Sequence, residues 1–154
     1  MRIRPASRED AVAISELLVA LSKAHIAMAF GEEGKRNLIG SMTPDSIEGY
    51  MEEGFRFHVA VEGPRVVGVV GTRDESHLFH LFVHDDFQGQ GLATQLWHVG
   101  RDACIDSGKN PGHFTVNSSL NAQQVYRHFG FEPLGGIREG GGVRDVPMRL
   151  ELHS

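Results

Sequence analysis

The sequence predicts a mixed α/β fold, α+β in strict usage, with helices on both faces of a central sheet of about seven mostly antiparallel strands. Three observations predict it. Apolar residues recur with a helical period in some segments and alternate with a strand period in others. Short turns join consecutive strand segments and favour hairpins, whereas helical segments separate the strands later in the chain. Nineteen glycines, nearly twice the usual share, indicate many tight turns and close backbone approaches.

Length and composition limit the class of protein. The chain has 154 residues, of which 40% are hydrophobic and 23% charged, so we expect one globular domain over residues 1–154. The net charge of -5 argues against a nucleic-acid binder, which needs a basic surface. A single cysteine, Cys104, excludes an internal disulfide, and no stretch reaches the ~18 apolar residues of a membrane span. We therefore expect a cytoplasmic protein without membrane or nucleic-acid partners.

The first part of the chain contains a predicted strand and predicted helices. Residues 2–4 are typical of a short strand that Pro5 ends. Ser7 and Asp10 have the spacing of a capping box, and a helix to about Lys23 follows, because these apolar residues share one helical face: Ala11, Ile14, Leu17, Leu18 and Leu21. Residues 25–40 predict a loop or a poorly determined helix. Thr43 and Pro44 then begin a helix that ends at Gly54.

Three strands are predicted in the middle of the chain. Residues 55–61 alternate apolar and polar side chains, residues 66–72 form a β-branched run, and residues 77–83 combine aromatic and branched side chains. Turns rich in glycine, proline and acidic residues separate these segments, so we expect hairpins.

The last part of the chain predicts two helices among further strands. A helical period extends from Leu92 to near Gly108, and a strand over residues 113–117 follows. A short helix over residues 121–129 ends at Gly130. Residues 131–137 and 143–150 then predict a final hairpin around residues 139–142, a glutamate followed by three glycines.

A glycine-rich loop, residues 88–93, joins the strand at residues 77–83 to the next helix. Unpaired amides and the positive end of the helix dipole meet at such a loop, which makes it an anion-binding site. Its glycines allow positive φ and let a phosphate approach the backbone. The lysine that a nucleotide-hydrolase loop requires is missing after this loop. A dinucleotide-binding fingerprint is also excluded, because its third glycine would fall at Thr94. The loop therefore predicts a diphosphate ligand held mainly by the backbone.

The residues around this loop resemble a known family. Gln88, Gly91 and Ala93 are similar to the Gln/Arg-x-x-Gly-x-Gly/Ala motif with which the GCN5-related N-acetyltransferases bind acetyl-CoA. Residues 116–131 resemble a second motif of that family, and the resemblance covers most of the chain from Phe55 onward. It implies an acyl-CoA N-acyltransferase fold and the transfer of acetyl to a primary amine, with acetyl-CoA as cofactor and coenzyme A as product.

The resemblance also implies where the cofactor binds. The pyrophosphate is expected on the amides of the loop residues Gln88, Gly89, Gln90, Gly91, Leu92 and Ala93. The pantetheine arm is expected where two parallel strands splay apart, on the backbone of Leu81, Phe82 and Val83. Three side chains are expected along the cofactor, the last of them as the best candidate for a direct contact: Asn117, Ser119 and Asn121.

Acetyl transfer to an amine needs a base for the ammonium proton and an acid for the leaving thiolate, because the parent pKa values are ~10.4 and ~8.5. By resemblance, Tyr126 contacts the cofactor and takes the position of the acid, and a packed aromatic residue is the alternative. His77 and His80 are the candidate bases, although half-buried structural histidines or an ordered water as base explain the pattern as well. Regular alternation puts the two histidines on opposite faces unless a bulge intervenes.

Two other kinds of chemistry are not expected. Strand geometry splays His77, His80 and His84 apart, whereas zinc needs three or four convergent ligands, so we expect no metal site. Cys104 fits a small core residue better than a nucleophile. The sequence therefore favours direct transfer in a ternary complex over a covalent acetyl-enzyme.

The acceptor is expected to contact residues 25–40, the helix over residues 43–54 and the final hairpin around residues 138–144. Glutamates in these segments would attract a cationic amine, although a solvated helix face explains them as well. We expect a small-molecule or peptide amine as substrate, and a homodimer is open because the final hairpin offers a sheet edge. The alternatives are a non-catalytic acyl-CoA-binding or sensing domain of the same fold, and a nucleotide phosphate-binding protein.

Overall fold

The computed structural model describes residues 1–23, 31–140 and 143–152. Short 3-10 helices, η1 (Arg8–Asp10) and η2 (Asp85–Phe87), precede α1 and α5. The α-helices are α1 (Ala11–Leu21), α3 (Gly31–Gly40), α4 (Pro44–Glu52), α5 (Leu92–Asp106) and α6 (Gln123–His128). The strands are β1 (Arg2–Pro5), β2 (Arg56–Glu62), β3 (Arg65–Arg73), β4 (His77–Val83), β5 (His113–Ser118), β6 (Glu132–Pro133), β7 (Arg138–Gly140) and β8 (Val143–Glu151).

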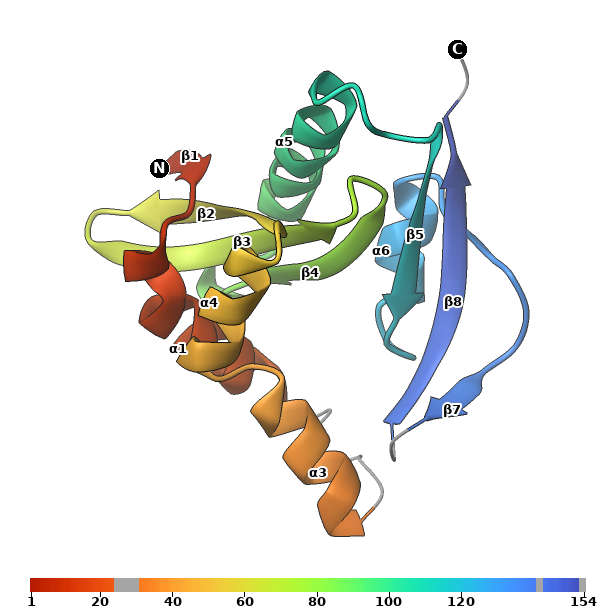
Figure 1. The fold of residues 1–154 in the computed structure, drawn as a ribbon, viewed down its shortest axis with the longest axis horizontal. Helices are drawn as coiled ribbons and strands as arrows, with labels where there is room; N and C mark the ends of the chain where they lie inside the picture. Colours follow the sequence, from red (N-terminus) through yellow and green to blue (C-terminus); the bar gives the residue numbers. More distant parts are fainter. Residues whose placement is uncertain (24–30, 141–142, 153–154) are drawn as a thin grey trace.

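The strands follow the order β1-β2-β3-β4-β5-β8-β6, and β7 pairs with β8 outside this path. Every pairing is antiparallel except that of β4 with β5. In Figure 1, β2, β3 and β4 run across the view while β5 and β8 run along another direction, so the two halves of the sheet turn away from each other. This arrangement confirms the predicted mixed, mostly antiparallel sheet.

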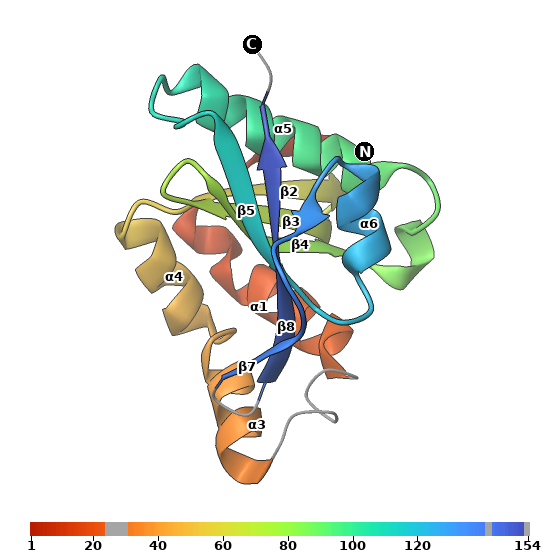
Figure 2. The same ribbon diagram turned by 90° about the vertical axis from the view of Figure 1, so that its right-hand side faces the viewer.

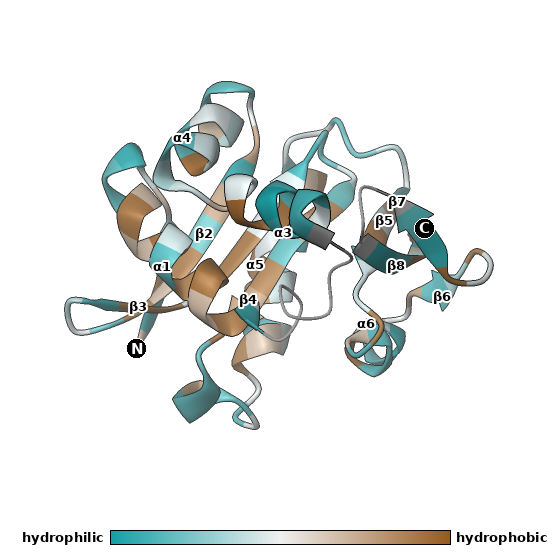
Figure 3. Cartoon of the chain, turned by 90° about the horizontal axis from the view of Figure 1, so that it is seen from below, coloured by the Kyte–Doolittle hydropathy of each residue, from teal (hydrophilic) through white to brown (hydrophobic). Residues whose placement is uncertain are grey.

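Apolar side chains fill both faces of the sheet. One cluster joins α5 and α6 to the strands through Leu96, Trp97 and Tyr126, and the other joins α1 and α4 through Leu18 and Ile47. Figure 2 shows α5 on one side of β2, β3 and β4, with α1 and α4 on the other side. Hydrophobic residues lie mainly on these strands and the adjoining helices, whereas α3 and β7 are mostly hydrophilic (Figure 3). Among the described residues, no helix is long and apolar enough to cross a bilayer.

The start of the chain folds as its capping pattern predicts. The backbone amide of Ser7 donates to Asp10 at 2.8 Å, and the Arg4 guanidinium holds both oxygens of that carboxylate at 2.9 Å. The hydrogen bonds to Arg4 lower the pKa of the Asp10 carboxyl. Thr43 accepts from the Ser46 amide at 3.1 Å and caps α4, as predicted.

The structure differs from the predicted elements in two segments. Residues 31–40 form α3, the helical alternative for that segment, while residues 24–30 lie outside the described residues. Of the predicted strand over residues 131–137 only β6 is a strand, and β7 follows it at Arg138–Gly140, which raises the strand number above seven. Pro133 has no amide to donate to a ladder, and Gly135 and Gly136 follow it, so strand pairing stops there. Gly141 and Gly142 of the predicted turn lie outside the described residues.

A bulge at Phe79 sets which residues of β4 face each helical layer. Gly71 of β3 pairs with His80 and Thr72 pairs with Leu78, so Phe79 is the extra residue. Leu78 therefore packs on the α5 side, while Phe79 and His80 both lie on the α1 side with their ring centroids 4.2 Å apart. His77 pairs with Arg73 and lies on the same face of the sheet as His80. Regular alternation would put the two histidines on opposite faces, and the bulge between them removes that difference.

Gly71 makes room for an aromatic group on this face. A Cβ built at Gly71 would lie 2.5 Å from Cε1 of Phe57, which is far below an ordinary contact distance. The Phe57 ring occupies that space and lies 5.9 Å from the ring of His80. The absent side chain at Gly71 therefore decides how closely the rings around His80 pack.

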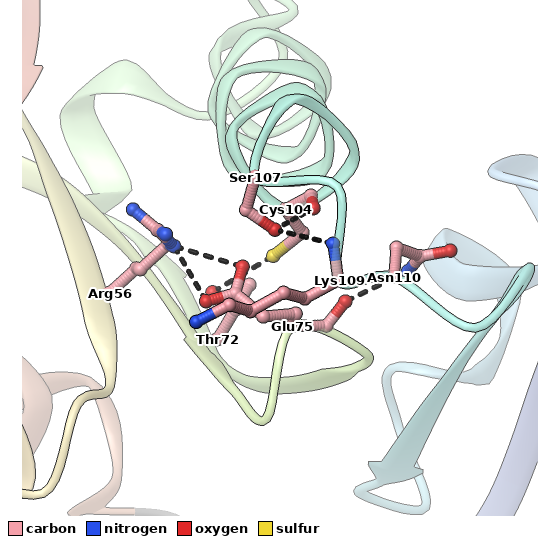
Figure 4. A network of polar contacts seen from close by, with 7 residues as sticks. All are labelled: Arg56, Thr72, Glu75, Cys104, Ser107, Lys109 and Asn110. Atoms are coloured by element: carbon pink, nitrogen blue, oxygen red, sulfur yellow. Dashed lines mark hydrogen bonds and ion pairs between the residues drawn. The ribbon is translucent and has the colours of Figure 1, made fainter.

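A polar network ties the turn between β3 and β4 to the end of α5 (Figure 4). Asp74 and Glu75 both have left-handed φ values, 55° and 59°, which are strained for residues with a side chain. The Arg56 Nε donates to both Glu75 carboxylate oxygens at 2.9 Å, and the Asn110 amide donates to the Glu75 carbonyl at 2.8 Å. These contacts hold the turn in its strained conformation.

Cys104 belongs to the core, as predicted. Its side chain is fully buried, and its Sγ donates to Thr72 Oγ1 at 3.3 Å. Burial raises the pKa of this thiol. With a rise of ~1.5 Å per residue, it lies roughly 18 Å along α5 from Leu92, at the end remote from the glycine loop.

We expect Gly71→Ala to lower the free energy of unfolding by about 1–3 kcal/mol, because the new Cβ would force the Phe57 ring out of its position. Urea denaturation measures the change. Gly49→Ala is the matched control, since Gly49 lies in α4 with no atom within 4 Å of an added Cβ, and there alanine should stabilise by roughly 0.5–1 kcal/mol. Equal effects of the two substitutions would contradict the proposed crowding.

Candidate functional site

The parallel strands β4 and β5 pair over only two positions, His77 with Thr115 and Leu78 with Val116. Beyond Leu78, β4 pairs with β3 alone, while β5 continues along β8 as far as Ser118. Within the part of the chain that the structure describes, one edge of residues 79–83 therefore has no strand partner. Backbone groups at such an edge are available to a ligand. This is the splayed pair of parallel strands that the sequence analysis expected.

The glycine loop follows β4 and ends at α5. Gly89 and Gly91 have φ values of 76° and 80°, and Gly91 is the N-cap of this helix of 15 residues. No hydrogen bond found among the described residues has the amides of residues 89–93 as donors. These donors and the positive end of the helix dipole therefore remain available to an anion.

A cleft of about 560 Å³, here called the first cleft, lies between the glycine loop and α6. Several predicted cofactor residues line it: Leu81, Val83, Gln88, Gly89, Gly91, Leu92, Ala93 and Tyr126. The lining also includes residues that the sequence analysis missed: Ala122, Val125 and Phe129. The spacing of Ala122, Tyr126 and Phe129 is i, i+4 and i+7, so one face of the predicted helix would have identified two of them.

Gln88 fixes the start of the loop through its side chain. Its Nε2 donates to the carbonyl of Val83 at 3.0 Å and to Oδ1 of Asp85 at 3.3 Å. The first of these bonds joins the loop to the end of β4. The Gln88 side chain thus holds the loop in position while the following amides stay without partners.

A second cleft of about 410 Å³ lies on the α1 side of the sheet. Its walls come from the end of α1, from α3 and the residues after it, from β4 and from β8: Leu21, Ser22, Leu38, Ser41, Met42, Phe79, His80, Phe82, Arg144 and Asp145. Two residues predicted along the cofactor, Asn117 and Ser119, border this cleft, as does Phe82. Gln90 and Asn121 line neither cleft.

The second cleft uses only part of the predicted acceptor surface. Leu38 comes from the segment for which the sequence predicts a loop or a poorly determined helix, and Arg144 and Asp145 come from the final hairpin. The helix α4 contributes none of the lining residues. Two of its glutamates, Glu48 and Glu52, instead lie 3.8 and 3.5 Å from the Arg8 guanidinium.

Tyr126 stands where the two clefts meet. It lines both of them, together with Leu81, Val83, Gln88 and Ala122. Its ring packs edge-on against Phe129 and Phe131, with centroids 6.3 and 5.9 Å away. Burial raises the pKa of the Tyr126 phenol to about 12, so the hydroxyl stays protonated over the neutral range.

His77 is buried and lines neither cleft. Its Nδ1 is 2.7 Å from Oγ1 of Thr115, which joins β4 to β5 at their short parallel pairing. Burial, and secondarily the nearby Arg73 charge, lower the pKa of the His77 imidazole to about 4. These contacts are those of a residue that ties two strands together.

His80 lines the second cleft and is absent from the first. The rings of Tyr50, Phe57, Phe79 and Phe82 surround it at centroid distances of 6.3, 5.9, 4.2 and 5.9 Å. Its Nδ1 is buried and has no hydrogen-bond partner among the described residues. Burial alone lowers the pKa of the His80 imidazole to about 4, so the ring is neutral near pH 7.

The described residues contain no group of three or more His, Cys, Asp or Glu side chains that could hold a metal ion.

A splayed pair of parallel strands, a glycine loop with free amides at a helix start and two clefts that share a tyrosine define a class: acyl-CoA-dependent acyltransferases with a mixed sheet. The comparison with family models agrees. Residues 26–152 match the GNAT acetyltransferase domain, so the chain belongs to that family. No curated protein sequence matches the chain significantly.

Solved structures show the same fold. A GCN5-related N-acetyltransferase from Rhodopseudomonas palustris aligns over 98% of this chain and 95% of its own, with a TM-score of 0.81 and 21% identity. PaiA N-acetyltransferase from Thermoplasma acidophilum, in complex with coenzyme A, aligns over 97% of this chain and 98% of its own, with a TM-score of 0.78 and 14% identity. YncA from Salmonella typhimurium, with its cofactor acetyl-CoA, aligns over 99% of this chain and 94% of its own, with a TM-score of 0.68 and 21% identity. These similarities confirm the predicted GNAT-like fold.

The low pKa values of His77 and His80 predict a loss of stability in acid. The folded pKa of each imidazole is about 4 against an ordinary value of 6.5, so only the unfolded chain takes up these protons between pH 6.5 and 4. The stabilisation is complete above pH 6.5 and is lost as the pH falls toward 4, by about 1–3 kcal/mol for each site.

His80→Phe should therefore make the free energy of unfolding less dependent on pH between 6.5 and 4, as urea melts at a series of pH values can measure. His98→Phe, at an exposed position of α5, is the matched control and should keep the dependence of the parent. An unchanged acid slope in His80→Phe would contradict the buried, neutral state of this ring.

Proposed function

We propose that the protein is an acetyl-CoA-dependent N-acetyltransferase that moves acetyl directly to a primary amine in a ternary complex. The observation that supports it best is the position of Tyr126, which lines both clefts beside the free edge of β4. A donor in one cleft and an acceptor in the other would meet at this residue. The coenzyme A and acetyl-CoA in the T. acidophilum and S. typhimurium structures support the choice of donor.

The glycine loop fits the diphosphate of acetyl-CoA. Gly89 and Gly91 adopt positive φ and leave open space where a Cβ would stand, so a phosphate can approach the backbone. The amides of residues 89–93 supply donors, and the start of α5 supplies the positive end of a helix dipole. Residues 88–93 include no cationic side chain, so backbone groups would carry this interaction.

The free edge of β4 fits an amide-containing chain. Residues 81–83 have no partner on the β5 side, and their backbone groups would pair with the pantetheine amides as an added strand does. We propose that Asn117 and Ser119, which border the second cleft, contact the cofactor near its reactive end. The contact of Asn121 with the cofactor stays a prediction.

The chemistry that acetyl-CoA supplies is a thioester activated toward amines. In the proposed reaction the amine nitrogen bonds to the acetyl carbon, the carbon–sulfur bond breaks and the amine loses one proton. Tyr126 donates a hydrogen bond to the sulfur as it becomes a thiolate, and the proton lost by the amine restores the balance through solvent. Because its pKa is raised to about 12, the phenol stays protonated near pH 7 and acts as a hydrogen-bond donor to the sulfur rather than giving up its proton.

Neither candidate histidine is well suited to remove the amine proton. A base works best when its pKa lies near the working pH, whereas both imidazoles have pKa values of about 4. His77 is moreover engaged by Thr115. We propose that water in the second cleft, rather than His77 or His80, takes the proton.

Direct transfer agrees with the position of the chain's one cysteine. Cys104 lines neither cleft, is fully buried and donates to Thr72. A covalent acetyl-enzyme would need an accessible, activated nucleophile. A cytoplasmic location, a small-molecule or peptide amine as acceptor and a homodimer stay predictions.

We expect Tyr126→Phe to lower kcat by about 100-fold or more, because the leaving sulfur loses its hydrogen-bond donor. Coenzyme A release from acetyl-CoA, with a panel of amines, amino acids and N-terminal peptides, measures the rate, and calorimetry measures coenzyme A affinity, which should change less than threefold.

Tyr50→Phe is the matched control, since Tyr50 is the chain's only other tyrosine, lines neither cleft and donates to the Ser41 carbonyl at 2.9 Å. It should lose stability and keep kcat. Tight acetyl-CoA binding without turnover of any amine by the parent protein would instead favour a non-catalytic sensing domain.

We expect Gly91→Ala to weaken acetyl-CoA binding by about tenfold, because a side chain at positive φ costs roughly 1–2 kcal/mol and the amides would turn to relieve it. Gly108→Ala is the matched control, since Gly108 follows α5, has a φ of 78° and also has open space around it. The Gly108→Ala variant should lose the same stability and keep its affinity for acetyl-CoA.

Calorimetry that finds ATP bound as tightly as acetyl-CoA would favour a nucleotide-binding protein.

A further inference from the structure

His80 lies in a mainly apolar part of the second cleft, whose other polar side chains are Ser22 and Ser41. The wall around it consists of Leu21, Leu38, Met42, Phe79 and Phe82. The hydroxyl of Ser41, beside Leu38, is already engaged, since it donates to the Leu38 carbonyl at 2.7 Å. A molecule bound against this wall would therefore meet apolar surface, one imidazole and the Ser22 hydroxyl.

The surroundings of His80 decide which of its nitrogens carries the proton. Nδ1 is buried and has no partner among the described residues. Leaving a buried N–H without an acceptor costs more free energy than leaving a buried lone pair without a donor. The neutral ring therefore carries its proton on Nε2 and leaves Nδ1 unprotonated. The rings of Tyr50, Phe57, Phe79 and Phe82 hold the imidazole in place and bring no charge to it. The ring therefore offers the cleft an N–H donor.

We propose that His80 selects the acceptor: its Nε2–H donates to an uncharged oxygen close to the reacting amine of a substrate with an apolar body. This inference rests on the proposed function, because it describes the acceptor cleft of the same reaction. An amide of an apolar α-amino acid has the required groups, namely a primary amine, a carbonyl oxygen next to it and an apolar side chain.

The charges of the second cleft favour an uncharged oxygen over a carboxylate. Its charged lining residues are Asp85, Arg144 and Asp145. The Arg138 guanidinium holds Asp145 with two bonds of 2.9 and 3.0 Å, and Arg144 lies 3.4 Å from Glu139. Among the described residues, the Asp85 carboxylate accepts a hydrogen bond only from the Gln88 side-chain amide, so the remaining charge facing the cleft is negative and disfavours an anionic acceptor.

The tautomer of His80 can be measured without any substrate. Long-range ¹H–¹⁵N correlation spectra of the labelled protein at pH 7 should show a protonated Nε2 and an unprotonated Nδ1 for one histidine. His80→Gln should remove that signal, whereas His98→Gln, at an exposed position of α5, should keep it. A proton on Nδ1 would overturn the proposal.

Two matched amines test the selection. Phenylalaninamide carries the carbonyl oxygen, and 2-phenylethylamine lacks it. With rates compared at equal concentrations of the neutral amine, we expect the parent protein to favour phenylalaninamide by about tenfold in kcat/KM. His80→Phe should abolish this preference. His80→Gln places an amide N–H near the position of Nε2 and should retain a preference of at least about threefold. His98→Phe should keep the parent ratio.

An equal loss of turnover for both amines in His80→Gln would show that the imidazole acts on the amine itself and would overturn the proposal. So would an absent preference in the parent protein. Failure of the proposed function has a different signature, since then no amine of the wider panel releases coenzyme A while the tautomer spectrum stays as expected.

Discussion

The short parallel pairing of β4 with β5 is the constraint on which the site depends. After Leu78 and Val116 the strands part, β4 staying with β3 and β5 with β8. The parting leaves one edge of β4 free and brings the two clefts to a common boundary at Tyr126. A longer ladder would close that boundary, and a donor on one side of the sheet would then be separated from an acceptor on the other.

Packing on the α1 side connects the fold to the chemistry of the second cleft. The bulge at Phe79 turns His80 to this face, and Gly71, directly opposite His80, leaves room for the Phe57 ring. The aromatic side chains then remove water from one edge of the imidazole and leave it neutral. Arg56 and Asn110 hold the strained turn at Asp74 and Glu75 through hydrogen bonds to Glu75. The turn therefore keeps β3 and β4 in a fixed register where they lead to the site.

Local signals in the sequence predicted the parts of the fold that depend on neighbouring residues. β4 begins and ends where the turn residues and the aromatic run place it, and the glycine loop begins its helix as expected. The bulge at Phe79 was not predictable, because it depends on the register of β3 opposite. The second cleft combines Leu38 with Arg144, which are far apart in sequence, and no periodicity reports such a contact. The distinction between His77 and His80 likewise needed the position of Thr115 on β5.

Backbone donors of the glycine loop and of β4 are proposed to hold the donor substrate across the parted strands. Titration of ¹⁵N-labelled protein with coenzyme A examines these donors one by one, through the shifts of individual backbone amides. The largest changes are expected on Gly89–Ala93 and on residues 81–83, with saturation at a single affinity. Changes confined to other surfaces, with these amides unmoved, would contradict this mode of binding.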